Sequence, residues 1–157
     1  MRKICAFILL ISILLFAMTG CGSAKSVDLK TVLSDINTQF SDAVDGLKEL
    51  SDVSELQACY SISPDDVKQF AAEIRTDSSQ APVEIVLVEA ASTDAADNVK
   101  TALDRRYGSI VNLYASYSPE QLALAKECEV TAVGNYVTMV VAENYSGIME
   151  IVDAAIK

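Results

Sequence analysis

Residues 83–89 read Val-Glu-Ile-Val-Leu-Val-Glu, and this stretch decides the fold. β-branched or other apolar side chains occupy every position from Ile85 to Val88, so both faces of a strand formed here are apolar. A strand with two apolar faces lies inside a sheet and is covered at least partly on each side. The stretch therefore predicts a central strand.

The residues before this strand predict a second strand and several helices. Residues 70–76 have the character of an edge strand, and the polar run 77–80 is typical of a turn between the two strands. Apolar residues at helical spacing predict a helix over about 27–40, with Ser26 available as its N-cap. Two short helical turns are expected after it, near 53–59 and from Ser63-Pro64.

The residues after the central strand predict two consecutive helices. The first is long and runs from about Asp94, with Thr93 as its cap. It ends at Ser118, where Ser118 and Gln121 have the spacing of a capping box and Pro119 suits the first position of a new helix. The sequence therefore predicts that one helix stops and a new one starts at Ser118-Pro119.

The last part of the chain predicts a hairpin and a final helix. Strands over 129–133 and 135–143 are expected to join at Gly134-Asn135, since both turn residues tolerate positive φ. Residues 145–156 carry the apolar stripe of a helix. Together the elements predict an α+β fold, with an antiparallel sheet of about four strands and helices packed mainly on one face.

The first residues have the pattern of a lipoprotein signal. Arg2 and Lys3 precede an apolar run that ends in Met-Thr-Gly-Cys at residues 18–21. In such signals small residues stand before a cysteine whose thiol accepts a diacylglyceryl group, after which the leader is cut away. The pattern predicts that residues 1–20 are removed and that lipidated Cys21 becomes the first residue of the mature chain.

Two other interpretations of this segment stay open. A permanent transmembrane anchor would need about 20 apolar residues, and the run here has about 15. Cleavage after Ala-Met-Thr at 17–19 would release the protein, but this triplet fits the small-x-small pattern only loosely. A diacylated Cys21 carries two chains, which is what stable attachment requires. We therefore expect a protein tethered to the extracytoplasmic face of a bacterial plasma membrane.

A single acidic domain is expected after the leader. Residues 21–27 hold the lipidated cysteine and a short linker, and residues 28–157 have the length of one domain. Loss of Arg2 and Lys3 leaves 10 basic and 22 acidic residues, a formal charge of −12. Nucleic acid is therefore not expected as a partner, because it is bound through Lys and Arg contacts to phosphate.

Cys59 and Cys128 are the two cysteines left in the domain. The redox setting outside a cell permits a disulfide between them, which would close a loop of about 70 residues and stabilise the fold by roughly 4 kcal/mol. Two buried apolar thiols are the alternative, since spacing does not show whether the Cα atoms come close enough. Neither neighbourhood holds a C-x-x-C motif or a histidine, so no redox role is expected.

Several motifs, in this order, resemble one family. They are Tyr60-Ser61-Ile62, Glu84-Ile85-Val86-Leu87-Val88, Arg105-Arg106, Tyr117-Ser118-Pro119-Glu120-Gln121 and Gly134-Asn135-Tyr136-Val137. From about Asp28 onward the chain resembles domain of unknown function 4358, which implies a small bacterial protein, often a lipoprotein, without an assigned activity. Ser61 departs from the family pattern, which often has glycine there. The resemblance implies no catalytic residue, and the matching positions of unknown role are Glu84, Arg106, Tyr117, Gly134 and Tyr136.

Some of these positions have a physical interpretation of their own. Glu84 opens an apolar strand, and a buried carboxylate needs a partner, for which Arg106 on the next helix is the candidate. The alternatives to this ion pair are that Glu84 is solvated at the strand end or that it contacts a ligand. Gly134 is most simply a turn residue. Five tyrosines have rings that suit either a recognition surface or a helix–sheet core, namely Tyr107, Tyr114, Tyr117, Tyr136 and Tyr145.

The sequence favours binding over catalysis. It has no histidine, which removes the commonest general base and the His-bearing zinc sites. It also lacks Ser-x-x-Lys, Gly-x-Ser-x-Gly, a Gly-rich phosphate loop and EF-hand spacing. No enzymatic activity, cofactor or metal is therefore expected. The predicted function is an interaction module that binds an envelope protein or wall component, and the alternative is a small-ligand or lipid-binding lipoprotein with an internal pocket.

Overall fold

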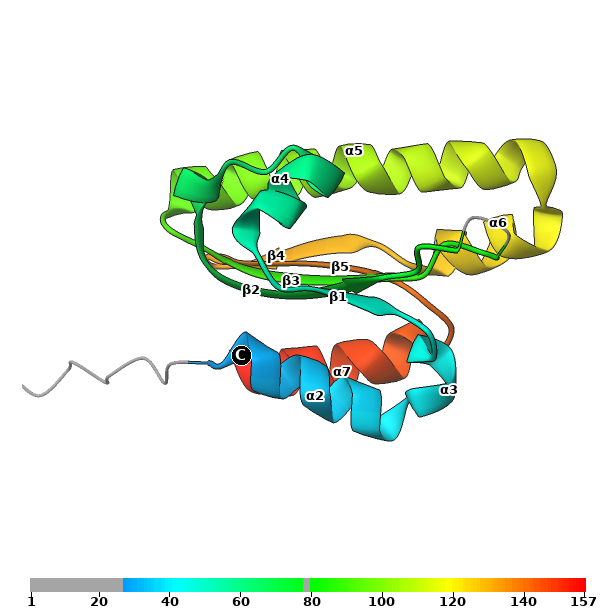
Figure 1. Ribbon diagram of the computed structural model, residues 1–157, viewed down its shortest axis with the longest axis horizontal. Coiled ribbons are helices and arrows are strands. Elements are labelled where there is room, and N and C mark those ends of the chain that lie inside the picture. The colour runs from blue at the N-terminus through cyan, green and yellow to red at the C-terminus, as the bar shows by residue number, and fades with distance from the viewer. Residues whose placement is uncertain (1–26, 78–79) are drawn as a thin grey trace, which may run out of the picture.

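Strand β3 (Glu84–Ala90) forms the centre of the fold, and all of its residues are buried. The computed structural model describes residues 27–77 and 80–157. In it, β3 pairs antiparallel with β2 (Val67–Ile74) on one side and with β5 (Tyr136–Val141) on the other (Figure 1). The predicted central strand is confirmed.

The sheet contains five antiparallel strands in the order β1-β2-β3-β5-β4. Its edges are β1 (Lys48–Leu50) and β4 (Val130–Val133). The prediction that residues 70–76 form an edge strand is wrong, because β1 pairs with the outer side of β2. A strand of three residues is too short to give an alternating pattern, which is why the sequence did not predict β1 and the expected sheet had about four strands.

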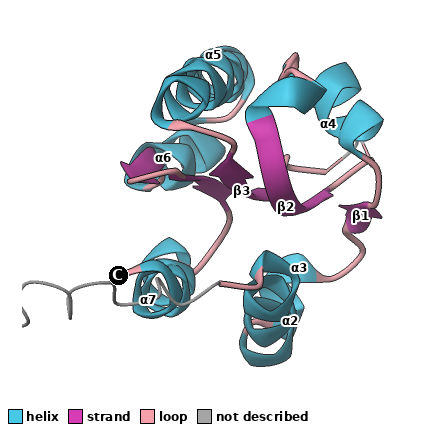
Figure 2. Ribbon diagram, turned by 90° about the vertical axis from the view of Figure 1, so that its left-hand side faces the viewer, coloured by secondary structure: helices cyan, strands magenta, loops and turns pink. Residues whose placement is uncertain are grey.

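Helices cover both faces of this sheet (Figure 1, Figure 2). One face is covered by α4 (Val53–Tyr60), α5 (Thr93–Tyr117) and α6 (Pro119–Glu127). The other is covered by α2 (Leu29–Gln39), α3 (Ser41–Val44) and α7 (Tyr145–Ile156). The antiparallel α+β fold is confirmed, whereas the expected placement of the helices mainly on one face is corrected to two helical layers.

The alternation of side chains along β3 explains the two layers. Val86 and Val88 pack in the core that α5 covers, while Ile85 and Leu87 pack in the core that α2 and α7 cover. Successive side chains of a strand point to opposite faces, so a strand that is apolar at each position needs a cover on each side. The N-terminal and C-terminal helices together provide the second cover.

The predicted boundary between α5 and α6 is confirmed. The Ser118 side chain accepts a hydrogen bond from the backbone of Gln121, and Pro119 is the first residue of α6. At its other end α5 is capped by Ser92, one residue before the expected Thr93. Although α5 has 25 residues, no helix within the described ranges is long and apolar enough to cross a membrane.

Two other helix starts differ from the prediction. The N-cap of α2 is Asp28, whose carboxylate accepts a hydrogen bond from the backbone of Lys30. The expected cap, Ser26, lies outside the described residues. Ser63 begins only a single 3₁₀ turn, η2 (Pro64–Asp66), because the chain enters β2 directly afterwards.

Gly134 and Ser61 are two of the described residues with positive φ, and each lies in a connection between elements. Gly134 has a φ of 58° in the turn between β4 and β5, which confirms both the hairpin and the role expected for this glycine. Ser61 has a φ of 60° at the end of α4. This left-handed conformation favours glycine, which agrees with the glycine that the resemblance led us to expect at this position.

Candidate functional site

Glu84 and Arg106 form a buried ion pair at the start of β3. Arg106 projects from α5, and its Nε lies 3.0 and 3.2 Å from the two carboxylate oxygens of Glu84. Its Nη2 donates a further hydrogen bond to Glu84 Oε1. The Glu84 side chain is 4% exposed and that of Arg106 is 39% exposed. The predicted ion pair is confirmed, and Arg106 occupies both carboxylate oxygens.

Tyr60, the last residue of α4, lies close to this ion pair. Its hydroxyl is buried and has no hydrogen-bond partner among the described residues. Burial raises the pKa of Tyr60, and the negative charge of Glu84 raises it further. The hydrogen bond to Glu84 likewise raises the pKa of Arg106. The cluster therefore ties α5 to the start of β3, with the last residue of α4 beside the ion pair.

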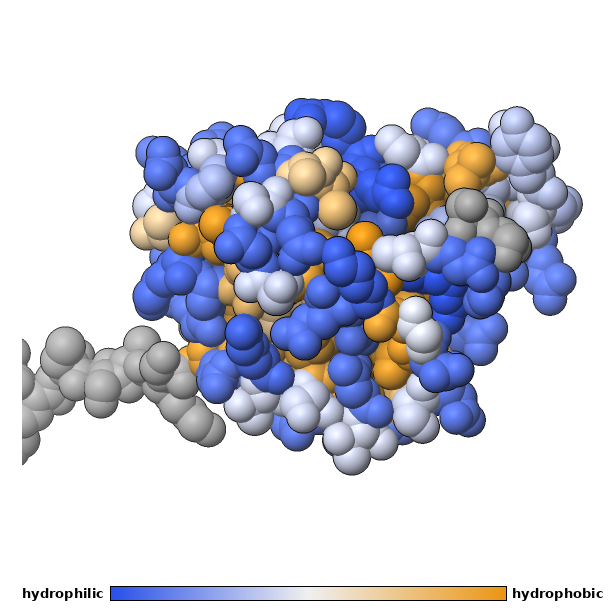
Figure 3. Space-filling view, in the orientation of Figure 1, coloured by the Kyte–Doolittle hydropathy of each residue, from blue (hydrophilic) through white to orange (hydrophobic). Residues whose placement is uncertain are grey.

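An apolar hollow lies at the C-terminal end of α5. Leu113 is 48% exposed and Tyr117 is 82% exposed, and these are the large hydrophobic side chains that the described part of the chain leaves in solvent. With Ala81, Pro82 and Tyr114 they line a hollow of about 320 Å³, which we call the α5 surface. In the space-filling view, hydrophobic atoms reach the surface in this region among hydrophilic ones (Figure 3).

Arginine side chains border the α5 surface. An adjoining hollow of about 230 Å³ is lined in part by Arg75, Arg106 and Leu113. Arg75 donates hydrogen bonds to the backbone oxygens of Ala81 and Asp45, each at 3.3 Å, and no ion pair between described residues includes it. The α5 surface therefore suits a partner that places an apolar side chain next to a carboxylate.

Tyr117 is the one exposed ring among the five tyrosines that the sequence singled out. Tyr114 is buried, and the half-buried rings are Tyr107, Tyr136 and Tyr145. The hydroxyl of Tyr107 donates to the backbone oxygen of Ala125 at 2.8 Å. Core packing therefore accounts for the other four, including the family-matching Tyr136.

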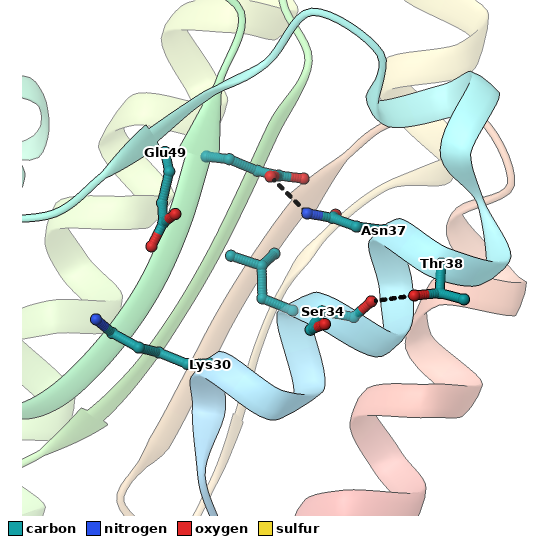
Figure 4. A pocket seen from close by; sticks show the side chains of 7 residues that line it. Lys30, Ser34, Asn37, Thr38 and Glu49 are labelled. Atoms are coloured by element: carbon teal, nitrogen blue, oxygen red, sulfur yellow. Dashed lines mark hydrogen bonds between the residues drawn. The ribbon is translucent and has the colours of Figure 1, made fainter.

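A polar pocket of about 350 Å³ lies on the other face of the sheet, between α2 and the edge formed by β1 and β2 (Figure 4). Its polar lining consists of Lys30, Ser34, Asn37, Thr38, Glu49 and Glu73. The Asn37 Nδ2 donates to Glu73 Oε2 at 3.1 Å. Sequence reasoning missed this pocket, because its wall includes the short strand β1 and because Glu73 lies in a segment that was expected to be an edge strand.

Gln69 holds the start of the domain against β2. Its Oε1 accepts a hydrogen bond from the Leu29 backbone at 3.2 Å, and its Nε2 donates to the Val27 backbone oxygen at 2.7 Å. Gln69 also donates to Glu89, which forms an ion pair of 2.6 Å with Lys68. Burial alone would raise the pKa of Glu89, but the hydrogen bonds from Lys68 and Gln69 lower it overall. Val27 and Leu29, at the start of the described chain, are thus fixed to the sheet.

Cys59 and Cys128 are free thiols, so the candidate disulfide is not formed. Cys59 is exposed on α4, whereas Cys128 is buried where α6 ends. The alternative of two buried thiols is therefore right for Cys128 and wrong for Cys59. Burial raises the pKa of the Cys128 thiol, which disfavours the reactive thiolate. The predicted lipidation site, Cys21, lies outside the described residues.

Residues 41–142 match the family described as domain of unknown function (DUF4358). The chain belongs to this family. The matched range runs from the start of α3 to the end of β5, so the DUF4358 segment contains the whole sheet and the α5 surface. It also contains the five family-matching positions named above. No curated protein and no solved structure matches the chain.

The two longer helices of the second face, α2 and α7, lie outside the DUF4358 match, whereas α3 lies within it. α2 ends at Gln39, before the matched range begins, and α7 begins at Tyr145, after it ends. The polar pocket therefore combines Glu49 and Glu73 of the DUF4358 segment with residues of α2.

Proposed function

We propose that this DUF4358 protein is a lipid-anchored interaction module on the extracytoplasmic face of a bacterial plasma membrane, and that it binds an envelope protein through the α5 surface. The exposure of Leu113 and Tyr117 on a single helix face is the observation that carries the proposal. Large apolar side chains that gather on a surface and are bordered by polar groups are typical of interaction sites. Arg75 beside them favours a partner with a carboxylate.

The arrangement of α5 suits recognition. Leu113 and Tyr117 follow Arg106 by seven and eleven residues, so the three side chains form one stripe along the helix. Arg106 is tied to the buried carboxylate of Glu84, which fixes the helix against the sheet. Tyrosine and arginine are among the residues that dominate interface energies, and a tyrosine ring loses little conformational entropy on binding.

Binding accounts for this face better than catalysis does, because the buried Glu84 is ion-paired and burial favours the neutral form of Tyr60. A general acid or base needs a group that can exchange a proton with a substrate. The α5 surface supplies contact area and a cation instead.

Lipidation of Cys21 would hold the domain near the membrane, with the α5 surface at the far end of the domain from the start of α2 (Figure 1). The linker over residues 22–26 reaches roughly 20 Å when extended, at about 3.5 Å per residue. We expect labelled fatty acid to enter the wild-type protein and not the Cys21→Ala variant, because the thiol of Cys21 is the acceptor. Metabolic labelling followed by gel fluorography makes the measurement. Equal labelling of both proteins would remove the anchor from the proposal.

Photocrosslinking in living cells tests the α5 surface. We expect p-benzoylphenylalanine in place of Tyr117 to form an adduct with one envelope protein, while the same probe in place of Glu150, an exposed residue of α7, forms none. Leu113→Ser is expected to reduce the adduct from position 117 several-fold, since losing an interface anchor costs at least about 1 kcal/mol of binding energy. Immunoblotting and mass spectrometry identify the adduct.

Two comparisons make this experiment decisive. Leu113→Ser should lower the free energy of unfolding by no more than about 1 kcal/mol, because about half of its surface is in solvent. The adduct should also weaken in Cys21→Ala, which removes the protein from the membrane. Equal adducts from positions 117 and 150, or an adduct that Leu113→Ser leaves unchanged, would contradict binding through the α5 surface.

A further inference from the structure

We propose that the polar pocket between α2 and the β1–β2 edge binds a small molecule through a primary ammonium group. This site goes beyond the protein contact proposed for the α5 surface, because it lies against the opposite face of the sheet. Glu73 and Asn37 are joined in its interior, and Lys30 and Glu49 stand opposite one another across it (Figure 4).

Glu73 supplies the acceptor that such a ligand needs. The residue is only 5% exposed, and its Oε1 is buried without a hydrogen-bond partner among the described residues. The neighbouring Asn37 Oδ1 is also buried and unpartnered within the same ranges. Asn37 Nδ2 already donates to the other carboxylate oxygen of Glu73. Buried acceptors without a donor are unfavourable, so the site is suited to a molecule that brings several N–H donors.

The two carboxylates of the pocket also favour the binding of a cation. Glu49 lies directly opposite Glu73 in the register of β1 and β2, so their side chains share one face of the sheet. Like charges at directly opposite positions repel each other. Burial raises the pKa of Glu73, and the charge of Glu49 adds to this rise. A bound cation would offset both effects.

Lys30 does not satisfy Glu73. It precedes Asn37 by seven residues on α2, which corresponds to about 10 Å along the helix axis. Figure 4 shows its ammonium group and the Glu49 carboxylate pointing toward one another across the pocket, and no ion pair between described residues includes Lys30. Lys30 is therefore not the donor for the buried oxygens of Glu73 and Asn37, which a ligand ammonium group could contact. The Lys30 ammonium group can contact an anionic group on the same ligand.

A primary ammonium group fits this pocket better than a metal ion. Calcium takes six to eight oxygen ligands and magnesium demands an octahedral shell. The described ranges contain no group of three or more His, Cys, Asp and Glu side chains that could hold a metal. An ammonium group has three N–H donors for the oxygens of Glu73, Asn37 and Glu49. A volume of about 350 Å³ suits one small amine.

Calorimetric titration of the full-length protein in detergent tests the site, with n-butylammonium as the probe and tetramethylammonium as the matched control. Both ions carry one positive charge, but only n-butylammonium donates N–H hydrogen bonds. We expect n-butylammonium to bind to a single site about tenfold more tightly than tetramethylammonium, the factor typical of a charge-assisted hydrogen bond in a buried site.

Paired variants locate the binding. Glu73→Gln should weaken n-butylammonium binding about tenfold or more, while Glu120→Gln, which removes the same charge from an exposed position on α6, should leave it unchanged. The folded-state pKa of Glu73 is raised, so ionisation of Glu73 lowers the stability of the protein as the pH rises through that pKa. Glu73→Gln should therefore keep a melting temperature at least equal to that of the wild type at neutral pH.

The proposal would be overturned by equal binding of the two ions or by equal effects of the two variants. Tighter binding of calcium chloride, or the absence of binding heat, would also overturn it.

Discussion

Arg106→Met is expected to lower the free energy of unfolding by about 3 kcal/mol, because it leaves the Glu84 carboxylate buried without a cation. The Glu84 side chain is 4% exposed, and Arg106 donates to both of its oxygens. Methionine keeps much of the length and packing of the arginine stem, so the loss reflects mainly the charge. We take the lower end of the range for a buried pair because the Arg106 side chain is 39% exposed and partly screened.

Urea denaturation followed by circular dichroism measures this loss. Lys100→Met is the matched control, since Lys100 forms an exposed ion pair of 2.7 Å with Asp104 on the same helix and should cost less than about 1 kcal/mol. The double variant Arg106→Met with Glu84→Gln should regain much of the lost stability, because a neutral amide costs less to bury than a carboxylate. If Arg106→Met is no more harmful than Lys100→Met, the pair does not hold α5 against the sheet.

A fragment of residues 41–142, the range that matches DUF4358, is expected not to fold by itself. It contains the sheet, the helices of one face and the short helix α3, but it lacks α2 and α7, which supply most of the cover on the other face. Without them, buried side chains such as Ile85, Leu87 and Val140 would be exposed. Exposing these three side chains alone costs about 5 kcal/mol or more, and a whole domain is stable by only about 5–15 kcal/mol.

Thermal unfolding by circular dichroism compares this fragment with residues 28–157. The longer chain should unfold in one cooperative transition and resist limited proteolysis. The fragment should show no such transition and should be degraded rapidly, because its unpaired apolar face stays in solvent. A cooperative transition of the fragment at the same temperature would contradict the role given to α2 and α7. Equal protease resistance of the two chains would contradict it as well.

The elements that the sequence predicted well depend on short stretches of chain. The start of α6 follows from Ser118 and Pro119, whose capping chemistry acts within one helical turn. The hairpin follows from Gly134, and the predicted range 145–156 is that of α7. Apolar residues on both faces of β3 indicated a central strand. In each case the signal lies in residues that are close together in the sequence.

The Glu84–Arg106 pair shows how far such reasoning extends to a site. Its prediction needed only a buried strand end and a nearby helix, since an unpaired buried charge is costly. The polar pocket is different, because Asn37 and Glu73 are 36 residues apart and Glu49 comes from a strand of three residues. Nothing in the local pattern of these residues marks them as neighbours.

The sequence by itself determined the central strand, the long helix after it, the hairpin and the antiparallel α+β class. Each of these depends on local hydrogen bonding and on the period at which apolar side chains recur. Only the tertiary structure decided that α2 and α7 cover the second face, that β1 makes β2 an interior strand, and that Glu73 meets Asn37 while Leu113 and Tyr117 stay exposed. These features depend on which apolar surfaces pack together over long sequence separations, and many local patterns are compatible with more than one such packing.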